Sequence, residues 1–172
     1  VVQHRPVALR DGSQLDIDIS DGIHDTLKKY PDMKIVGTVY GNWDATVTQK
    51  QVATVLPTLP QVDGVLDQGG DGYGSYQAFK AAGRPIPTII MGNRADELNL
   101  WKEMKANGYQ TYSVSSAPGM STIAFWIAQQ VLAGKKVPNT VNVPLLAIHD
   151  DTLDAWLAKT PTGTAASPNY TK

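Results

Sequence analysis

A glycine-rich loop carrying two acids and an amide follows a short apolar run near the middle of the chain. After Gly64-Val65-Leu66 the sequence reads Asp67-Gln68-Gly69-Gly70-Asp71-Gly72-Tyr73-Gly74. Glycines let a backbone approach a ligand closely, and carboxylate and amide groups suit sugar hydroxyls, which both donate and accept hydrogen bonds. We therefore predict ligand contacts from Gln68, Gly69 and Asp71. The alternative is a plain strand-to-helix turn that Asp71 caps.

Side chains after other apolar runs would point into the same crevice. Asn93 and Arg94 follow one such run, and Arg offers a rigid fork of donors for hydroxyl pairs or a carboxylate. Ser116 lies in a Ser-Ser-Ala-Pro-Gly segment that looks like a hinge. We predict ligand contacts from these three residues; the alternatives are a capped loop with a solvated Arg and an ordinary helix start. Trp43 either stacks on a sugar face or, as we favour, anchors packing at a helix start.

Other chemistries find little support in the sequence. The loop at 67–74 lacks the Gly-Lys-Ser/Thr ending of a phosphate loop, and its two acids would repel phosphate. Segment 16–22 resembles a calcium loop, but its glycine is one place late and Leu27 stands where the final glutamate ligand belongs. We expect a strand-to-helix loop there. The three His residues show no metal spacing, and no Gly-x-Ser-x-Gly elbow is present. We expect no catalytic residues, no metal and no cofactor.

Length and composition favour one α/β domain. The chain has 172 residues, with 15 Lys and Arg against 16 Asp and Glu, so we expect no nucleic-acid surface. No apolar run approaches the roughly 20 residues that a membrane helix needs. Cysteine is absent, which permits an oxidising compartment without requiring one. The start at Val1 lacks signal-peptide features, so either a signal was removed or the chain begins within a longer protein.

Short apolar runs alternate with amphipathic helices along the chain. We predict strands at 7–9, 33–40, 64–66, 87–91, 109–114 and 141–148. We predict helices from an N-cap at Ser20 to Tyr30, after an N-cap at Asp44, at 71–82, at 95–106, from Pro118 to Gly134, and after a cap at Asp150 or Asp151. The tail from Thr160 should lie extended on a surface. This alternation implies a three-layer α/β/α fold with a mainly parallel sheet, whose ligands bind outside the carboxyl ends of the strands.

The order of these segments resembles the second lobe of type I periplasmic sugar-binding proteins of ABC transporters, of the ribose, xylose and polyol type. The resemblance covers roughly residues 6–170, and the order and spacing of its landmarks are more specific than any one of them. The landmarks are the segments Tyr30 to Val36, Gly41 to Asp44, Leu59 to Val65, Asp67 to Ala78 and Val137 to Asp154.

The resemblance implies a two-lobe clamp that closes on a sugar or polyol and then docks on an ABC permease in the membrane. The chain would be a solute-binding component, not an enzyme, in the periplasm or, in a Gram-positive source, outside the cell on a lipid anchor. Residues 1–118 would form the second lobe and 119–140 would cross into a missing first lobe. Residues 141–172 would hold the return strand, the terminal helix and the tail.

Carried over residue by residue, the family's site fits only in part. The resemblance puts Gln68, Gly69 and Asp71 at or beside the ligand, although relatives often have Asn where Gly69 stands. Arg94 occupies a strand-end position where many members have Asp. Ile19 stands where many have Arg. These departures argue against an ordinary pyranose or ribose specificity.

Two other functions compete with transport for this sequence. The effector domain of a sugar-responsive transcription repressor shares this fold, but no helix-turn-helix or basic patch is visible, and the ending from Val143 to Leu157 favours the transporter type. An enzyme of flavodoxin-like fold would need a nucleophile, a metal or a phosphate loop.

The helix at 119–133 would lack its usual partner if the first lobe is missing. Its apolar face, with Ile123, Trp126, Ile127 and Val131, would stay exposed. A face of that kind tends to be covered by another chain. We therefore expect either a rearranged C-terminal half or a homodimer formed by exchange of this segment.

Overall fold

A parallel sheet forms the centre of the fold. The computed structural model describes residues 6–10 and 13–170. In this part of the chain, four parallel strands run in the order β2-β1-β3-β4, and β5 pairs with β6 antiparallel. The strands are β1 (Pro6–Arg10), β2 (Gly37–Tyr40), β3 (Gly64–Leu66), β4 (Thr88–Ile89), β5 (Ser113–Ser115) and β6 (Leu146–Ile148).

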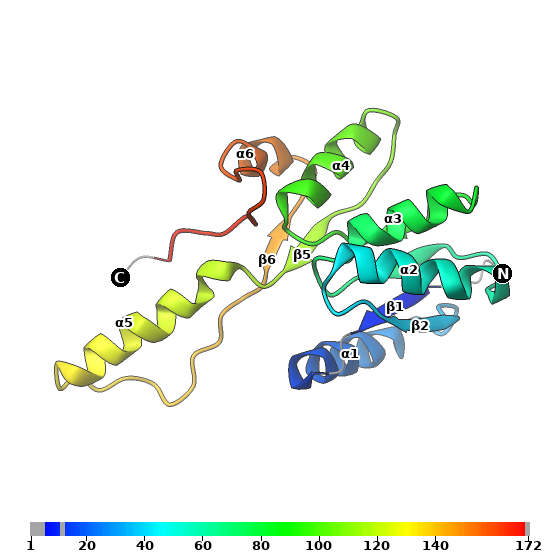
Figure 1. Cartoon of the computed structure of the whole chain (residues 1–172). Coiled ribbons are helices and arrows are strands. Elements are labelled where there is room, and N and C mark those ends of the chain that lie inside the picture. Colours follow the sequence, from blue (N-terminus) through cyan, green and yellow to red (C-terminus); the bar gives the residue numbers. More distant parts are fainter. Residues whose placement is uncertain (1–5, 11–12, 171–172) are drawn as a thin grey trace.

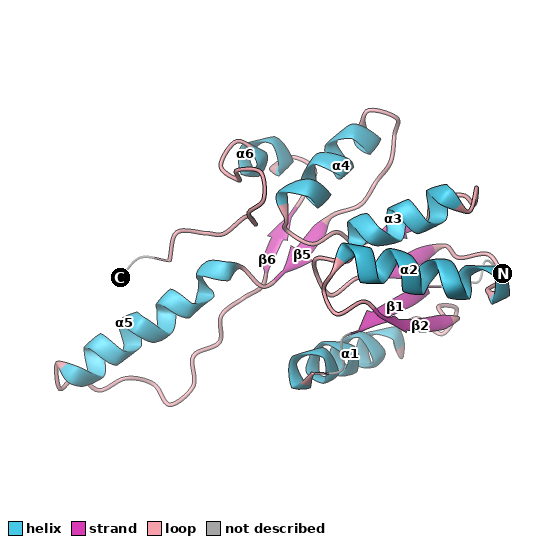
Figure 2. Ribbon diagram, in the orientation of Figure 1, coloured by secondary structure: helices cyan, strands magenta, loops and turns pink. Residues whose placement is uncertain are grey.

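Helices cover both faces of the sheet (Figure 1). One face carries α2, α3 and α4 side by side with α6 next to α4, and α1 lies on the opposite face (Figure 2). This arrangement confirms the predicted three-layer α/β/α fold. The helices are α1 (Gln14–Leu27), α2 (Ala45–Val55), α3 (Gly72–Ala81), α4 (Ala95–Lys105), α5 (Ser121–Leu132) and α6 (Leu153–Leu157).

The β5–β6 ribbon continues the main sheet through one residue. Met91, just beyond β4, forms a parallel bridge with Ser113. Its N–H donates to the carbonyl of Tyr112 at 3.0 Å, and its carbonyl accepts from Val114 at 3.0 Å. Because β5 runs parallel to β4, the carboxyl ends of β1, β3, β4 and β5 meet at one edge. The predicted, mainly parallel sheet is therefore confirmed, with β6 as an antiparallel edge strand.

The core lies mainly between the sheet and the α2–α3–α4 layer. Asp44 caps α2 as predicted, because its carboxylate accepts the N–H of Val47 at 2.8 Å. Helix α3 stops before Gly83, whose φ of +63° suits a residue without a Cβ. The most deeply buried apolar side chains are Val7, Val52, Leu56, Val65, Ala78, Phe79, Ile89, Met91, Leu98, Trp101, Ile148 and Leu153.

The first helix begins earlier than the sequence predicts. Ser13, not Ser20, is the N-cap, and its hydroxyl accepts the N–H of Asp16 at 3.2 Å. Ser20 lies inside α1 and is buried, and Tyr30 lies beyond the helix, 55% exposed. The predicted loop at 16–22 is therefore wrong. Polar and apolar residues alternate in this segment, and that period of two hides a helix whose buried side is partly polar.

Four strands, β2, β4, β5 and β6, are shorter than predicted. Beside β4, side chains take over part of the backbone hydrogen bonding. Residues 33–36, 109–112 and 141–145 lie outside the strands. The Tyr109 hydroxyl donates to the carbonyl of Pro87 and accepts the N–H of Ile89, both at 2.6 Å. Thr111 donates its hydroxyl proton to the Ile89 carbonyl. These side chains satisfy backbone hydrogen-bonding groups at β4 that a neighbouring strand would otherwise satisfy.

The C-terminal part departs from its prediction at two points. The N-cap of α6 is Thr152 rather than Asp150 or Asp151. The tail does more than lie on a surface, because Ala166 is buried and its N–H donates to the Asn93 carbonyl at 2.7 Å. The tail therefore packs beside the loop that joins β4 to α4.

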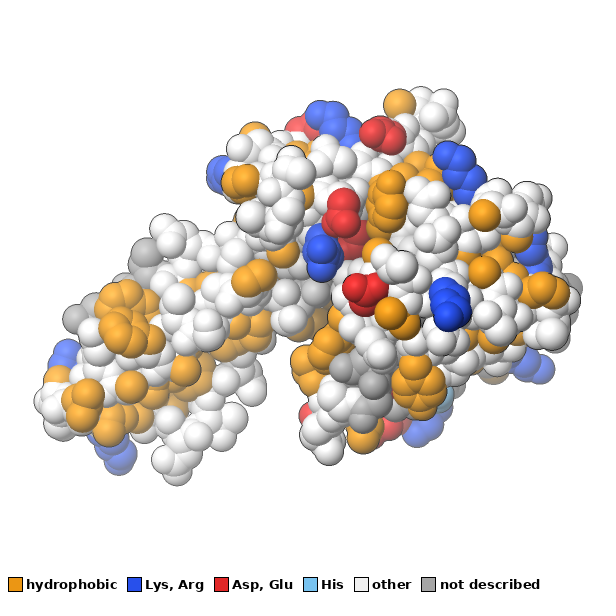
Figure 3. All heavy atoms as spheres, viewed as in Figure 1, with side chains coloured by type: hydrophobic (Ala, Val, Ile, Leu, Met, Phe, Trp, Pro, Cys, Tyr) orange, Lys and Arg blue, Asp and Glu red, His pale blue; other side chains and the backbone are white. Residues whose placement is uncertain are grey.

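Helix α5 projects away from the rest of the molecule as an arm with apolar side chains on its surface (Figures 1 and 3). It follows a 3-10 turn at Pro118–Met120, and none of its residues is buried. Of the face expected to be open, Val131 is exposed, whereas Ile123, Trp126 and Ile127 are half-buried. Phe125 and Leu132 are exposed in addition. Where the structure describes the chain, its helices are too short or too polar to cross a membrane. The domain boundaries at 118 and 140 stay predictions.

Phe79 should matter more to stability than any exposed aromatic residue, because its ring is 1% exposed and lies at the centre of the core. We expect Phe79→Ala to lower the free energy of unfolding by about 3–5 kcal/mol, from lost burial and the cavity left behind. Tyr30→Ala, at an exposed turn, is the control and should change it by less than about 0.5 kcal/mol. Urea unfolding followed by circular dichroism gives both values, and equal losses would contradict the assigned core.

Candidate functional site

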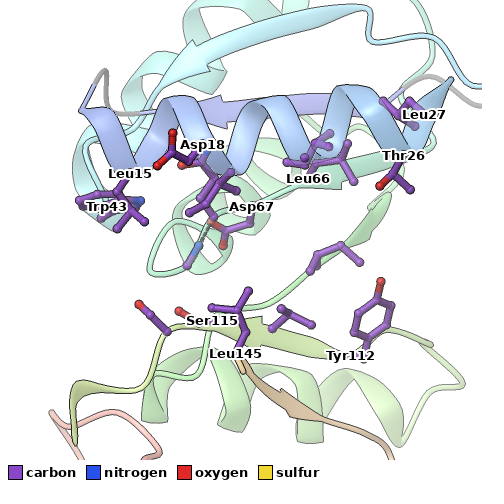
Figure 4. Close-up of a pocket in the computed structure, with 18 residues that line it drawn as sticks. Leu15, Asp18, Thr26, Leu27, Trp43, Leu66, Asp67, Tyr112, Ser115 and Leu145 are labelled. Carbon is purple, nitrogen blue, oxygen red and sulfur yellow. Dashed lines mark hydrogen bonds between the residues drawn. The ribbon is translucent and has the colours of Figure 1, made fainter. Parts of the chain in front are cut away.

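An open groove separates α1 from the β5–β6 ribbon, on the sheet face opposite α2 to α4 (Figure 4). Its volume is about 650 Å³. Leu66, Ile90 and Val114 lie along it, one from each of three neighbouring strand segments. Figure 4 shows residues of α1 and of the β3 end facing Ser115, Tyr112 and Leu145 across this space. The groove therefore opens along one face of the sheet and reaches its carboxyl edge.

The two ends of the groove differ in chemistry. Asp18 and Trp43 lie near Asp67 at one end, whereas Leu27 and Tyr112 lie at the other (Figure 4). Gln68, Gly69 and Ser116 also line the groove, so half of the six predicted ligand residues share it. We refer to the end formed by Asp18, Trp43 and residues 67–69 as the polar end. It coincides with the carboxyl ends of the strands, where ligands of α/β sheets bind.

The Gln68 side chain is held in one orientation. Its Nε2 donates to Oδ1 of Asp16 at 2.8 Å and to the Asp16 carbonyl at 3.3 Å, which ties the β3 end to α1. Its Oε1 is buried and has no hydrogen-bond partner in the described structure. A buried carbonyl oxygen without a partner is costly unless a donor reaches it. Gln68 therefore offers a fixed acceptor for a hydroxyl.

The backbone after Gln68 turns through a conformation that favours glycine. Gly69 and Gly70 have φ values of +112° and +90°. The Gly69 N–H donates to Oδ1 of Asp67 at 2.7 Å, which closes the turn. A Cβ on Gly69 would collide with the Ser115 hydroxyl, and one on Gly70 would lie 3.1 Å from the Trp43 carbonyl. A side chain at position 69 would therefore displace Ser115 and strain the backbone.

The other predicted ligand residues lie outside the groove. Asp71 is fully buried at the N-cap position of α3, yet its side chain does not cap that helix. Its Oδ1 accepts the Thr48 hydroxyl at 2.7 Å instead. Asn93 is buried and donates to the carbonyls of Ser116 at 3.2 Å and Ala166 at 2.9 Å. Arg94 is half exposed, and its Nε lies 3.6 Å from Asp96. Direct ligand contact by these residues stays a prediction.

The groove residues without a predicted ligand contact include Leu15, Asp18 and Trp43. Both Leu15 and Asp18 lie on α1, and Asp18 falls in the segment 16–22 that the sequence analysis predicts as a loop. Trp43 was assigned to packing, but it lies in the groove and outside the core. Asn42 and Trp43 have φ values of 54° and 53°, an uncommon conformation for residues other than glycine. Backbone strain of this kind clusters at functional sites.

Two buried acids lie beneath the polar end. Asp67 ends β3 and Glu97 lies in the first turn of α4, and both side chains are buried. Burial raises the pKa of Asp67 well above its ordinary value, and the charges of Glu97 and Asp71 raise it further. Burial also raises the pKa of Glu97, although hydrogen bonds from the N–H groups of Gly92 and Gly72 oppose that shift.

Comparison with known proteins places this fold and groove in a family. A family model described as a periplasmic binding protein domain matches residues 8–136. The xylitol-binding protein of Mycolicibacterium smegmatis is 28% identical over 148 residues, which are 83% of this chain and 41% of that protein.

Solved structures agree. An ABC transporter solute binding protein from Thermobispora bispora is 32% identical with a TM-score of 0.89, and the match covers 98% of this chain and 52% of that one. A Mycobacterium smegmatis structure in complex with β-D-fucofuranose is 25% identical with a TM-score of 0.73, covering 92% and 53%. This chain thus spans about half the length of the relatives it matches. Since the family model covers most of it, the chain belongs to the periplasmic binding protein domain family.

Proposed function

We propose that this chain is one lobe of the solute-binding component of an ABC importer, and that the polar end of its groove binds a sugar or polyol. The observation that carries the proposal is the fixed Gln68 side chain, whose Oε1 faces no partner at the carboxyl edge of a parallel sheet. The xylitol-binding and fucofuranose-bound relatives support a polyhydroxylated ligand.

The residues at the polar end suit such a ligand in complementary ways. Hydroxyl groups donate to carbonyl and carboxylate oxygens, so Gln68 Oε1 and the Asp18 carboxylate would accept from them. The glycine turn at Gly69 lets the ligand approach the backbone. Trp43 would stack its ring on the apolar C–H face of the ligand. Asp71 and Asn93 act through the loops that they hold, and Arg94 would reach the ligand only from the rim.

The second half of the site would come from a second lobe. A two-lobe receptor closes on its ligand and then docks on a membrane permease, in the periplasm or at the cell exterior. Binding by closure needs no catalytic residue, so we propose no reaction for this site. The relatives named above are solute-binding proteins, which favours transport over the repressor alternative.

The exposed apolar side chains of helix α5 require a binding partner of their own. Its twelve residues carry no charged side chain, and Phe125 and Leu132 are exposed. In a two-lobe receptor the other lobe would bury this helix. For the present chain alone, we propose a homodimer in which the segment after Ser116 is exchanged between copies, because exchange of an identical element is a low-cost route to burial.

The 172-residue chain by itself should bind xylitol only weakly, because one lobe provides about half of the contacts. We expect a Kd of about 1 mM or weaker, equivalent to roughly 4 kcal/mol or less. A titration followed by two-dimensional NMR should shift the amide signals of Gln68, Gly69 and Ser116. Trp43→Leu should weaken binding about fivefold, since a stacking contact is worth about 1 kcal/mol. Tyr30→Leu, outside the groove, is the control.

Two results would count against this site. A micromolar Kd for the single chain would show that one lobe suffices, and shifts confined to residues far from the groove would place the ligand elsewhere.

The oligomeric state tests the proposed exchange. Light scattering during size-exclusion chromatography should show a dimer whose fraction grows over a roughly hundredfold range of protein concentration. Phe125→Lys should yield a monomer, because it places a charge in the proposed interface. Gln129→Lys adds the same charge on the same helix at a polar position and should leave the dimer intact. A monomer at every concentration would refute the homodimer.

A further inference from the structure

Asp67 and Glu97 meet beneath the two loops that approach the polar end. Among the described residues, no donor reaches Oδ2 of Asp67 or Oε2 of Glu97. Glu97 acts to raise the pKa of Asp67, whereas Asp67 acts to lower the pKa of Glu97. A Cβ on Gly72 would lie 2.6 Å from Oε1 of Glu97 and 3.0 Å from Oδ2 of Asp67, which places both oxygens beside the same point of the backbone. An ionised carboxylate has no proton to donate, so a hydrogen bond between these two carboxyl groups requires that one of them is protonated.

The surrounding hydrogen bonds identify the partner that carries the proton. Oε1 of Glu97 accepts the N–H groups of Gly72 at 2.8 Å and Gly92 at 3.2 Å, as suits an ionised carboxylate. Within the described residues, Oδ1 of Asp67 accepts the N–H of Gly69 at 2.7 Å, and Oδ2 has no donor beside it and can carry a proton. The proton therefore resides on Asp67.

The charges that act on the pair are also acidic. Among the described residues, Asp71 of the β3–α3 loop raises the pKa of Asp67, and Asp96 of α4 raises that of Glu97. Arg94, the cation on the neighbouring loop, lies nearest to Asp96 and is half exposed. Loss of the proton would leave two buried like charges side by side, which is strongly unfavourable.

We propose that Asp67 and Glu97 are positioning residues that share one proton, and that this shared proton holds the β3–α3 and β4–α4 loops together. Glu97 contacts the backbone of both loops, at Gly72 and Gly92, and Asp67 fixes the turn at Gly69. When the proton leaves, the two carboxylates repel each other and the loops separate. If the proposed sugar site is correct, its affinity falls with the same titration.

The sign of the pH dependence follows from the raised pKa of Asp67. Between the ordinary carboxyl value of 3.8 and this raised value, the folded chain binds one more proton than the unfolded chain. The stability of the fold therefore decreases as the pH rises through this window. A neutral side chain at position 67 removes this dependence.

Asp67→Asn gives a direct test, because its amide donates to Glu97 as the protonated acid does and its carbonyl still accepts from Gly69. In the wild-type chain, the NMR amide signals of Gly72 and Gly92 should titrate with one common midpoint, and the urea midpoint should fall as the pH rises through it. Both effects should vanish in Asp67→Asn. Asp96→Asn, which removes a neighbouring charge only, should keep the titration.

Unchanged titration of both glycine amides in Asp67→Asn would overturn the shared proton. A xylitol titration then tests the loops' role: above the midpoint, the wild-type Kd should rise about tenfold per pH unit and that of Asp67→Asn should stay level. A wild-type Kd that does not change with pH would overturn the positioning role. If xylitol fails to bind at any pH while the amide titration depends on Asp67, the proton pair stands and the sugar proposal fails.

Discussion

Buried polar side chains that link loops from different strands hold the functional edge of this fold together. Parallel strands bring their carboxyl ends to one edge, but they leave the loops beyond that edge without ladder hydrogen bonds. Gln68 joins β3 to α1, Asp71 joins the start of α3 to Thr48 of α2, and Asn93 joins β4 to the tail. Each link also satisfies a polar group that would be costly to bury alone. The geometry of the groove depends on these links being complete.

The alternation of apolar runs and helices was enough to predict the three layers, the mainly parallel sheet and most helices. Asp44 and Gly83 were identified from local chemistry that does not depend on the rest of the chain, namely a capping carboxylate and a residue free to adopt positive φ. Strand lengths were less predictable. Whether Ile89 pairs with a strand or with the side chains of Tyr109 and Thr111 is a tertiary outcome that no local pattern records.

The site was only partly predictable for a related reason. The edge position of Gln68 and Gly69 follows from strand order, but the side chain of Asp71 turns inward because Thr48 lies within reach across 23 residues. The Asn93 side chain likewise turns inward, because it donates a hydrogen bond to the Ala166 carbonyl of the tail. Asp18 was missed because the start of α1 was placed too late. Trp43 could have been identified from the sequence, because a Trp between Asn and Asp at a helix start can either pack into the core or stay exposed to a ligand. The sequence analysis favours packing.

Several features that cost stability lie at the carboxyl edge of the sheet. Asn42 and Trp43 adopt left-handed backbone conformations, Asp67 and Glu97 bury carboxyl groups, and Gln68 buries an oxygen without a partner. The opposite, α2–α4 side of the sheet holds a well-packed apolar core around Phe79 and Trp101. Real proteins break local rules mainly where function requires it, and the rest of the fold offsets the cost. This grouping favours the carboxyl edge as the place of function, by an argument that does not use the relatives.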